Sequence, residues 1–478
     1  MSALREAADA DVAPDPRTAV RSVGGARATH EARLTRLREQ YAAMPIERPV
    51  RLAKRTSNLF RPRRRAAAHL LDVRGLDGVL AVDPVARTAD VQGMTTYEQL
   101  VDATLAHGLM PLVVPQLKTI TLGGAVSGLG IESSSFRNGL PHESVREMEV
   151  LTGDGRVVLA RPGNEHDALF RGFPNSYGTL GYALRLTIEL EPVKPFVRLR
   201  HVPFGDPDAC FAALAEVCAG RSYAGEPVDF VDGTVFGAGE LYLTLGTFAD
   251  DAPASSDYTG MEVYYRSLQR RRVDHLTVRD YLWRWDTDWF WCSRAFGVQD
   301  PRVRRLVPKR WLRSDSYWKL VDLERRFGPA RRLNRLRGRG DWEDVVQDVE
   351  IPIERASEFF AFMVREIPIL PFWLCPLRRR ERSSGWDLYA LDPEATYVNF
   401  GFWSTVPLGE GERDGARNRR IEQVVSELGG RKSLYSTSYS DRDEFWRLYN
   451  GSAYAELKAA YDGDHRLLDL YEKCVGRG

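Results

Sequence analysis

Three short segments in the first half of the chain combine residue types that suit a phosphate-bearing ligand. Thr121–Ser135 holds four glycines and ends in three serines, with Gly139 just beyond it, while Gly178–Gly181 and Lys54–Arg61 complete the set. Glycine lets backbone N–H groups approach a phosphate closely, and hydroxyl, Arg and Lys side chains add donors and charge. The spacing fits neither a Walker loop nor a Rossmann fingerprint. Each segment taken alone is equally consistent with a tight turn.

A second group of residues could deliver a proton to a substrate. The candidates are Glu132 in the glycine-rich segment, Asp387, Tyr389, Tyr435 and Tyr439. The alternative interpretation is structural, with tyrosines half-buried and hydrogen-bonded and Glu132 capping a turn. We interpret His142 as a structural residue. The five cysteines are scattered and form no CxxC pair, so we expect neither a disulfide framework nor a metal site.

The elements that must position these residues form one α+β unit over residues 45–195. Residues 1–44 are expected to be a disordered tail to about residue 28, followed by a short polar helix at 32–43. Within the unit, β-rich runs bounded by turn residues surround two helices and a hairpin that turns at Asp154-Gly155. The expected strands cover 50–54, 69–73, 78–83, 88–92, 110–114, 149–159 and 180–191, and the expected helices 96–107 and 165–173.

Residues 196–405 show a strand–helix–strand pattern twice, which predicts a ferredoxin-like cap domain. A basic helical insertion at about 270–340 separates the two halves. The expected strands cover 197–202, 240–248, 346–351, 369–374 and 396–403, and the expected helices 206–219 and 354–366. Residues 406–478 are expected to be helical, with a strand-like link at 431–439, and to pack back toward the first unit.

Composition limits the class of protein. The 478 residues are 43% hydrophobic and 28% charged, which is typical of a globular protein. The longest apolar run, residues 367–377, contains three prolines and is too short to span a bilayer. The N-terminus has no apolar stretch of a secretory signal, and few cysteines fit a reducing cytoplasm.

Two further segments have an unusual composition. Tyr281–Trp291 contains four tryptophans, and Tyr281, Trp285 and Trp289 share helical spacing. This pattern predicts either a buried helix face or an apolar wall for an acyl chain. Arg294–Arg339 contains fifteen Arg or Lys and four Asp or Glu, a net charge of +11 in a chain whose total is +1. Such a segment is either a solvated, salt-bridged surface or a docking surface for anionic phospholipid.

The order of these segments resembles the FAD-binding domain of the vanillyl-alcohol oxidase / p-cresol methylhydroxylase superfamily. Within it, the chain is most similar to the delta-24 sterol reductase (Diminuto/Dwarf) group, through Gly130-Ile-Glu-Ser-Ser-Ser135, Phe372-Trp-Leu-Cys-Pro376 and Arg442-Asp-Glu-Phe-Trp446. The resemblance covers nearly all of the chain after residue 45. The same group includes actinobacterial 10-methylene fatty acyl reductases. An Arg-rich composition typical of a GC-rich genome, and no membrane-spanning N-terminal segment, favour these relatives.

The resemblance implies a two-part FAD-binding domain and FAD held without a covalent bond, because the three segments contain no His or Cys. His142, just beyond the second segment, is the one residue that leaves covalent attachment open. The residues expected around FAD are Lys54, Arg55, Thr56, Ser57, Asn58, Leu59, Gly123, Gly124, Gly128, Gly130, Ile131, Glu132, Ser133, Ser134, Ser135, Gly139, Gly178, Thr179 and Gly181. Tyr439, Tyr435 and Glu132 are the expected catalytic residues.

The activity implied is NADPH-driven reduction of an isolated lipid double bond, most specifically of a 10-methylene fatty acyl group in a phospholipid to the 10-methyl chain. The alternatives are a delta-24 sterol-type reductase, an alcohol or sugar oxidase or dehydrogenase of the same fold, and a flavoprotein partner of a lipid methyltransferase. We expect a cytoplasmic protein, peripheral on the inner face of the cell membrane, with a lipid substrate and no nucleic-acid partner.

Overall fold

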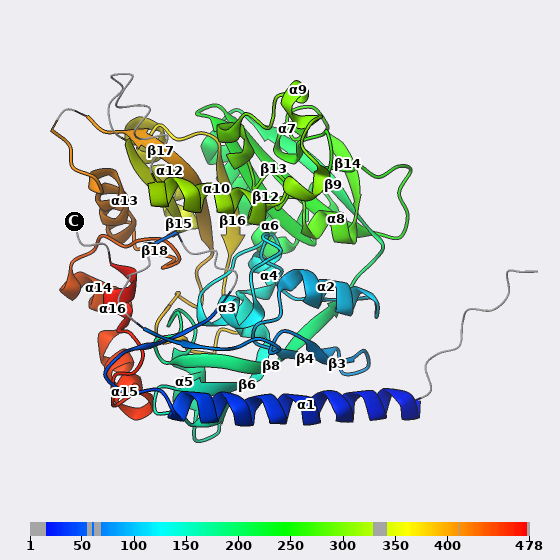
Figure 1. Cartoon of the computed structure of the whole chain (residues 1–478). Coiled ribbons are helices and arrows are strands. Elements are labelled where there is room, and N and C mark those ends of the chain that lie inside the picture. The colour runs from blue at the N-terminus through cyan, green and yellow to red at the C-terminus, as the bar shows by residue number, and fades with distance from the viewer. Residues whose placement is uncertain (1–15, 55–59, 62–67, 328–341, 410, 476–478) are drawn as a thin grey trace, which may run out of the picture.

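The computed structural model describes residues 16–54, 60–61, 68–327, 342–409 and 411–475. Two antiparallel sheets organise these residues, a six-stranded sheet built from the first half of the chain and an eight-stranded sheet built mostly from the second (Figure 1). The chain therefore has the α+β architecture that its sequence predicts. In Figure 1 the six-stranded sheet lies below the eight-stranded one, and the C-terminal helices run down one side of both.

The six-stranded sheet has the order β3-β4-β8-β6-β7, with β5 paired to β8. Helix α2 (Tyr97–Leu105), predicted at 96–107, begins with a capping box between Thr96 and Gln99. Three short helices, α3 (Leu122–Ser127), α4 (Ser135–Asn138) and α5 (Asp167–Gly172), complete the unit. The strands are β3 (Val79–Asp83), β4 (Thr88–Gln92), β5 (Leu109–Pro111), β6 (Val145–Thr152), β7 (Val157–Ala160) and β8 (Gly181–Pro192), beside a parallel pair β1 (Val50–Leu52) and β2 (His69–Leu71).

Helix α1 (Pro16–Ala42) begins much earlier than the helix predicted at 32–43 and runs beneath the six-stranded sheet (Figure 1). Leu34, Leu37 and Tyr41 are buried against the unit. His30 hydrogen-bonds Glu149 through Nε2 at 3.0 Å. Tertiary contacts therefore support a helix that local propensity alone would not extend. Residues 1–15, which were predicted to be disordered, lie outside the described residues.

The eight-stranded sheet has the order β14-β9-β13-β12-β16-β17-β15-β18. Its strands and helices in chain order are β9 (Phe196–Phe204), α6 (Pro207–Gly220), β12 (Phe230–Gly237), β13 (Glu240–Ala249), β14 (Val273–Thr277), β15 (Trp342–Pro352), α12 (Ala356–Glu366), β16 (Phe372–Leu377), β17 (Tyr397–Pro407) and β18 (Arg431–Lys432). A small hairpin, β10 (Ser222–Tyr223) with β11 (Glu226–Pro227), follows α6.

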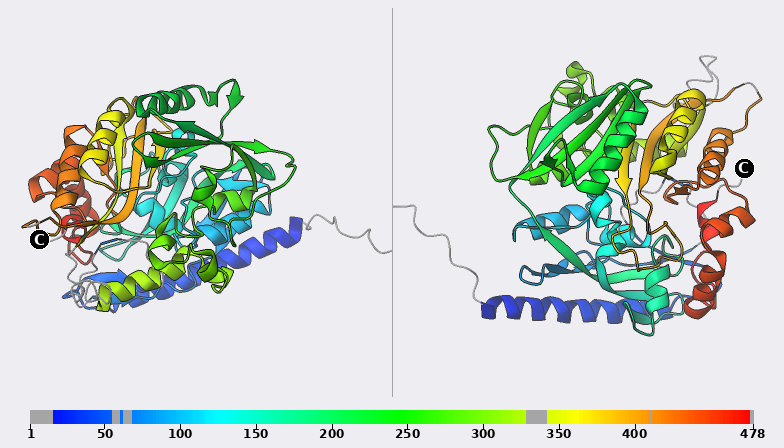
Figure 2. Two further views of the ribbon diagram at one scale, coloured as in Figure 1. Left: turned by 90° about the horizontal axis from the view of Figure 1, so that it is seen from above. Right: turned by 180° about the vertical axis from the view of Figure 1, so that it is seen from behind.

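Each half of this sheet is a split β-α-β unit. Strands β9 and β12 are joined through α6 and flank β13, while β15 and β16 are joined through α12 and flank β17. Helices α6 and α12 lie on the same face of the sheet (Figure 2, right). The two units pair edge to edge through β12 and β16. The sheet is therefore wider than the five strands predicted for the ferredoxin-like cap, because β12 and β14 were not recognised in the sequence and β18 comes from the C-terminal segment.

The tryptophan-rich segment is not a continuous helix. Helix α8 ends at Leu282 (Val278–Leu282), and Asp288, Trp289 and Phe290 have positive φ angles of 68°, 48° and 61°. Non-glycine residues adopt this conformation only when tertiary contacts impose it. A buried ion pair between Asp288 and Arg304 supplies such a contact at 2.6 Å. Helices α7 (Tyr264–Ser267), α9 (Pro301–Arg304) and α10 (Ser314–Phe327) flank this segment.

The C-terminal segment contacts both the first unit and the eight-stranded sheet, and its helices follow one another along it. They are α13 (Ala416–Glu427), α14 (Arg442–Leu448), α15 (Gly451–Tyr461) and α16 (Leu470–Cys474). Lys458 of α15 donates to the Thr179 carbonyl at 2.8 Å, and the Ser433 N–H donates to the Asp348 carbonyl on β15 at 3.1 Å. Of the strand-like link expected at 431–439, only β18 is a strand.

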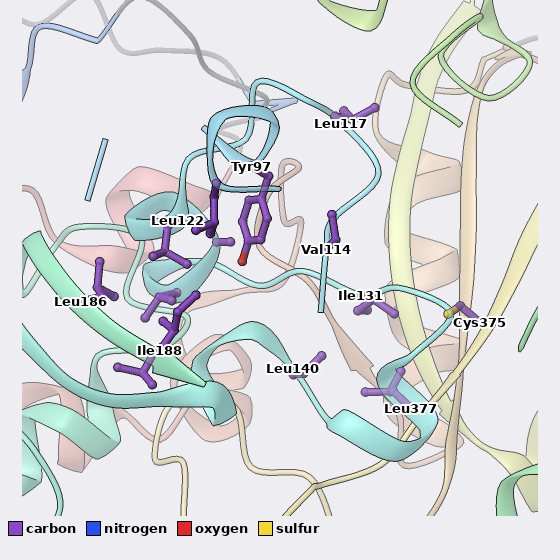
Figure 3. Close-up of a cluster of buried hydrophobic side chains, with 14 of the residues drawn as sticks. Tyr97, Val114, Leu117, Leu122, Ile131, Leu140, Leu186, Ile188, Cys375 and Leu377 are labelled. Carbon is purple, nitrogen blue, oxygen red and sulfur yellow. The ribbon is translucent and has the colours of Figure 1, made fainter. Parts of the chain in front are cut away.

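One hydrophobic core joins the two sheets. It extends from Leu186 and Ile188 on β8, past Leu122, to Cys375 and Leu377 on β16 (Figure 3). Within the described residues, no helix has the length and apolarity needed to cross a bilayer. The shared core fixes the distance between the sheets, and the site lies between them.

Candidate functional site

A cavity of about 520 Å³ lies between the two sheets and the C-terminal segment. Its lining brings together residues that are far apart in the sequence. The first unit contributes Lys54, Phe60, Arg61, Gly123, Gly124, Gly128, Gly130, Ile131, Tyr177 and Gly178; the rest of the chain contributes Trp289, Phe290, Asp348, Trp373, Trp403, Ser433, Tyr435 and Lys473. The cavity therefore has one wall of glycine and basic residues and another of aromatic and acidic residues.

The glycine wall has no room for larger side chains. A Cβ on Gly123 would lie 2.7 Å from the Gly93 carbonyl oxygen, and one on Gly128 would lie 2.9 Å from the Gly124 carbonyl oxygen. Both neighbours are backbone atoms, which cannot move aside cheaply. A Cβ on Gly124 would lie 2.8 Å from Thr121 Oγ1, the atom that caps helix α3. The glycines therefore form a surface that a flat or phosphate-bearing ligand can approach closely.

Three basic side chains face the same cavity. Lys54 Nζ donates to Thr121 Oγ1 at 2.9 Å, and Arg61 Nη1 donates to the Leu434 carbonyl at 2.6 Å. Arg61 Nη2 is buried and has no hydrogen-bond partner within the described residues. Burial, with the nearby Arg61 charge, lowers the pKa of Lys473 to about 7. An unsatisfied guanidinium beside two ammonium groups suits an anionic ligand such as a diphosphate.

Two residues that can carry a proton, Tyr435 and Asp348, line the opposite side of the cavity. Tyr435 accepts a hydrogen bond from Trp403 Nε1 at 2.9 Å and hydrogen-bonds the Asp348 carboxyl. Burial raises the pKa of Asp348 to about 7, and also raises the pKa of its neighbour Glu350 to about 8. Asp348 also accepts from Asn399 Nδ2 at 3.2 Å. The pair can therefore hold a proton at the cavity wall near neutral pH.

Aromatic rings form the remaining wall. Phe60 packs against Trp289 with ring centroids 5.5 Å apart, and Phe290 packs against Trp403 at 4.4 Å. The indole N–H of Trp373 donates to the Asp232 carboxylate at 3.1 Å, and Trp373 lines the cavity. The arrangement matches the apolar wall considered for the tryptophan-rich segment, although a loop and not a helix provides it.

The predicted serine string has a structural role. Ser133 Oγ donates to Glu132 Oε1 at 2.8 Å, Ser134 Oγ donates to the Leu112 carbonyl at 2.8 Å, and Ser135 Oγ accepts from the Glu132 N–H at 3.1 Å. Glu132 is buried and pairs with Arg284 at 2.7 Å. None of these four residues lines the cavity. Their assignment to the cofactor, and that of Glu132 to catalysis, therefore stay predictions that this cavity does not support.

The other predicted residues divide in the same way. Gly139, Thr179 and Gly181 lie outside the lining, and Arg55, Thr56, Ser57, Asn58 and Leu59 lie outside the described residues. Tyr439 lies beside α13, where its backbone N–H donates to Glu422 at 2.8 Å, and it does not line the cavity, so its catalytic role stays a prediction. His142 packs against Trp386, with ring centroids 4.5 Å apart, and does not line the cavity.

Sequence reasoning missed Asp348, Trp403 and Lys473, and included Arg61 only as the end of a polar loop. A signal for Asp348 was present, because Asp348 and Glu350 are acids two residues apart in a segment that was predicted to be a strand. Because side chains alternate between the two faces of a strand, both acids lie on the same face. Acidic side chains are rarely buried unless they are paired, so two acids on a buried face indicate a specific role. Lys473 gave no local signal, since only the return of α16 to Tyr177 places it in the cavity.

The comparison with protein families agrees with this geometry. A model described as an FAD binding domain matches residues 41–161, the segment that supplies Lys54 and most of the glycine wall. The close backbone surface and the unsatisfied Arg61 fit a dinucleotide with a diphosphate. The protein is an FAD-dependent oxidoreductase.

Its relatives identify the part of that class that it resembles. The chain is 26% identical to a delta(24)-sterol reductase of Arabidopsis thaliana, over 86% of this chain and 77% of the relative. The human delta(24)-sterol reductase is also 26% identical, over 83% and 75%. Cytokinin dehydrogenase 10 of rice is 26% identical, over 78% of this chain and 68% of the relative.

Proposed function

We propose that the protein uses NADPH and non-covalently bound FAD to reduce an isolated carbon–carbon double bond in a lipid. The observation that carries the proposal is the cavity itself, where Tyr435 and Asp348 face an aromatic wall beside the glycine surface. The names of the sterol reductase relatives support a lipid alkene as the substrate class. The specific substrate that we propose is a 10-methylene fatty acyl group of a phospholipid, reduced to a 10-methyl chain.

The chemistry requires two separate deliveries. An isolated alkene has no carbonyl to stabilise a carbanion, so a hydride must reach one carbon and a proton the other. The flavin, when bound, supplies the hydride. Tyr435 is the proton donor that we propose, because it lines the cavity and is backed by Asp348. The rings of Trp289, Phe290 and Trp403 would stabilise cationic character on the substrate and exclude water.

Anaerobic stopped-flow absorbance on the purified flavoprotein tests this proposal. NADPH should bleach the flavin band, and phospholipid bearing a 10-methylene chain should restore it while the saturated 10-methyl lipid accumulates. A sterol with a side-chain double bond tests the sterol alternative under the same conditions. Flavin bleaching by alcohols or amines, with no reoxidation by either alkene, would instead place the protein with dehydrogenases such as the cytokinin enzyme.

The substrate also defines where the protein would act. A 10-methylene chain must be made by transfer of a one-carbon group to an unsaturated acyl chain. We therefore propose that a lipid methyltransferase precedes this enzyme. Both would act at the inner face of the cell membrane, with this protein as a cytoplasmic, peripheral enzyme. Protein recovered in the soluble fraction under all salt conditions, with product formed only from free fatty acid, would contradict this placement.

A further inference from the structure

Four large apolar side chains are exposed to solvent close together in the sequence, on α9, α10 and the turns between them. Val303 is 41% exposed, Leu306 83%, Trp311 56% and Leu320 44%. They belong to α9, the turns after it and α10, which lie on one side of the molecule in the view from above (Figure 2, left). These four apolar residues, together with the exposed basic residues Arg302, Arg305, Arg310 and Lys319, are named the α9–α10 face.

The basic residues of the face lie in solvent, and the guanidinium of one of them, Arg310, lies over the Trp311 ring at 5.9 Å. Arg302, Arg305, Arg310 and Lys319 are exposed, and within the described residues none of them forms an ion pair. Two other arginines of the segment are committed elsewhere. Arg304 is buried on Asp288, and Arg313 holds Glu98 at 2.8 Å. Some basic residues of the segment therefore form structural ion pairs, and others are exposed beside apolar side chains.

Trp318 lies between the α9–α10 face and the aromatic wall of the cavity. Trp318 of α10 is half-buried, and its ring lies 4.7 Å from Phe60 and 5.6 Å from Trp289, measured between centroids. Both of those residues line the cavity. The next residues on α10, Lys319 and Leu320, are exposed on the face. An acyl chain that entered beside Trp318 would thus meet Phe60 and Trp289 of the cavity wall.

We propose that the α9–α10 face docks on an anionic lipid bilayer, so that an acyl chain passes from the bilayer beneath α10 into the cavity. Basic side chains attract anionic headgroups, while Trp and Leu side chains enter the headgroup–acyl boundary. The pairing of exposed cations with protruding apolar groups distinguishes such a surface from one that binds only a soluble polyanion. The identity of the acyl substrate in this inference rests on the proposed function. The vesicle-binding test of the docking surface does not depend on that function.

Flotation of the full-length flavoprotein with vesicles measures docking without any turnover. Vesicles of phosphatidylglycerol and phosphatidylcholine should bind the protein at low salt, and pure phosphatidylcholine vesicles should bind it at least tenfold more weakly. R305Q/R310Q should weaken binding to the anionic vesicles about 30-fold, since each basic residue near such a surface contributes about fivefold. L306N/W311A should weaken it at least tenfold.

The controls change matched residues elsewhere. Val85 is 93% exposed in the turn between β3 and β4, and Arg36 and Arg38 are exposed on α1. V85N and R36Q/R38Q should leave vesicle binding unchanged. Equal binding to anionic and neutral vesicles, or equal losses in the control variants, would overturn the inference.

Two further outcomes separate this inference from its alternatives. Full binding by L306N/W311A, together with displacement by duplex DNA, would identify a polyanion site and overturn the lipid assignment. On methylene lipid, R305Q/R310Q should lose activity toward vesicles and keep it toward detergent-dispersed lipid. If the unmodified protein reduces neither form yet floats with anionic vesicles, the proposed function fails and the docking surface stands.

Discussion

Tyr435 is the side chain on which the proposed chemistry depends most directly. Its hydroxyl lines the cavity between Trp403 and Asp348, and the ring beside it belongs to Phe60. We expect Y435F to slow alkene reduction at least 100-fold, because positioned proton donors contribute about 10²–10⁴. Flavin reduction by NADPH should stay within about twofold. Y439F, which changes a tyrosine outside the cavity, is the matched control, and an equal loss in both variants would reject Tyr435 as the donor.

Asp348 should make this proton transfer dependent on pH. Below its pKa of about 7 the protonated carboxyl donates to the Tyr435 oxygen, which leaves the tyrosine hydrogen free to face the substrate. Above it, the carboxylate accepts that hydrogen instead. Alkene reduction should therefore fall about tenfold per pH unit above 7, and D348N should flatten the profile. A wild-type rate of flavin reoxidation that is constant from pH 6 to 9 would contradict this role.

The same shift affects stability in a known direction. The pKa of Asp348 is raised from its ordinary value because burial disfavours the carboxylate. The folded protein then binds this proton more tightly than the unfolded chain does, so the contribution is present at low pH and is lost as the pH rises through about 7. D348N should consequently lose less stability than the unmodified protein as the pH rises from 4 to 7, as measured by urea unfolding at each pH.

Lys473 should couple FAD affinity to pH with the same sign. Burial and the Arg61 charge lower the pKa of its ammonium group to about 7, so the free site is partly neutral at physiological pH. An anionic diphosphate binds the protonated form more tightly. The Kd for FAD should rise about tenfold between pH 6 and pH 8, and K473M should bind more weakly with no such dependence. Titration of apoprotein by flavin fluorescence quenching measures both, and a pH-independent Kd for the unmodified protein would place the diphosphate away from Lys473.

Part of this site could be predicted from the residues alone. Lys54, the four glycines at 123, 124, 128 and 130, and Tyr435 were identified by type and order, and all line the cavity. Glu132 was identified by the same reasoning and lies elsewhere. Its role depends on Arg284, which is 152 residues further along the chain. Asp348, in contrast, was not predicted and does line the cavity. Its burial and its contact with Tyr435 exist only after the sheets pack.

At the scale of elements, Arg284 connects the serine string to the eight-stranded sheet. Its guanidinium bonds Glu132 at 2.7 Å and Asp232 of β12 at 2.9 Å, and Asp232 also accepts the indole N–H groups of Trp285 and Trp373. All of these groups are buried. The network therefore sets the position of the Trp373 ring in the cavity wall without touching a ligand.

Removing one member of this network should affect stability more than chemistry. E132A leaves Arg284 with a single buried carboxylate, and breaking a buried pair costs about 3–5 kcal/mol. E132Q keeps an acceptor and should cost less. Urea unfolding followed by tryptophan fluorescence measures both. If E132A unfolds like the unmodified protein but loses alkene reduction per bound flavin, Glu132 would return to the catalytic group.

Elements with strong local signals were predicted well, and elements that depend on packing were not. Helix α2 and the Asp154-Gly155 hairpin are set by neighbouring residues, so both were located from the sequence. Helix α1 is held by contacts such as that of His30 with Glu149, and the loop at Asp288 by its pair with Arg304. No local pattern contains such information.

At the scale of the whole molecule, the cavity is the joint between the two sheets. One wall comes from the unit matched by the FAD binding domain model, and the other from β15, β16, β17 and the C-terminal segment. A cofactor bound there contacts both parts of the molecule at once. Any ligand that binds only when both walls are in place must stabilise their association as well as each part.

This geometry predicts the thermal unfolding of the flavoprotein. FAD at about 100 times its Kd should stabilise the folded state by about 2.7 kcal/mol, which raises Tm by about 3 °C for a chain of this size that unfolds in one transition. Because the walls belong to different sheets, calorimetry should show a single transition that shifts as a whole when FAD is added. K473M should reduce the shift at the same FAD concentration, whereas Y439F should not. Two transitions, of which FAD moves only the one belonging to the first unit, would mean that the cofactor does not bridge the sheets and that the aromatic wall is organised without it.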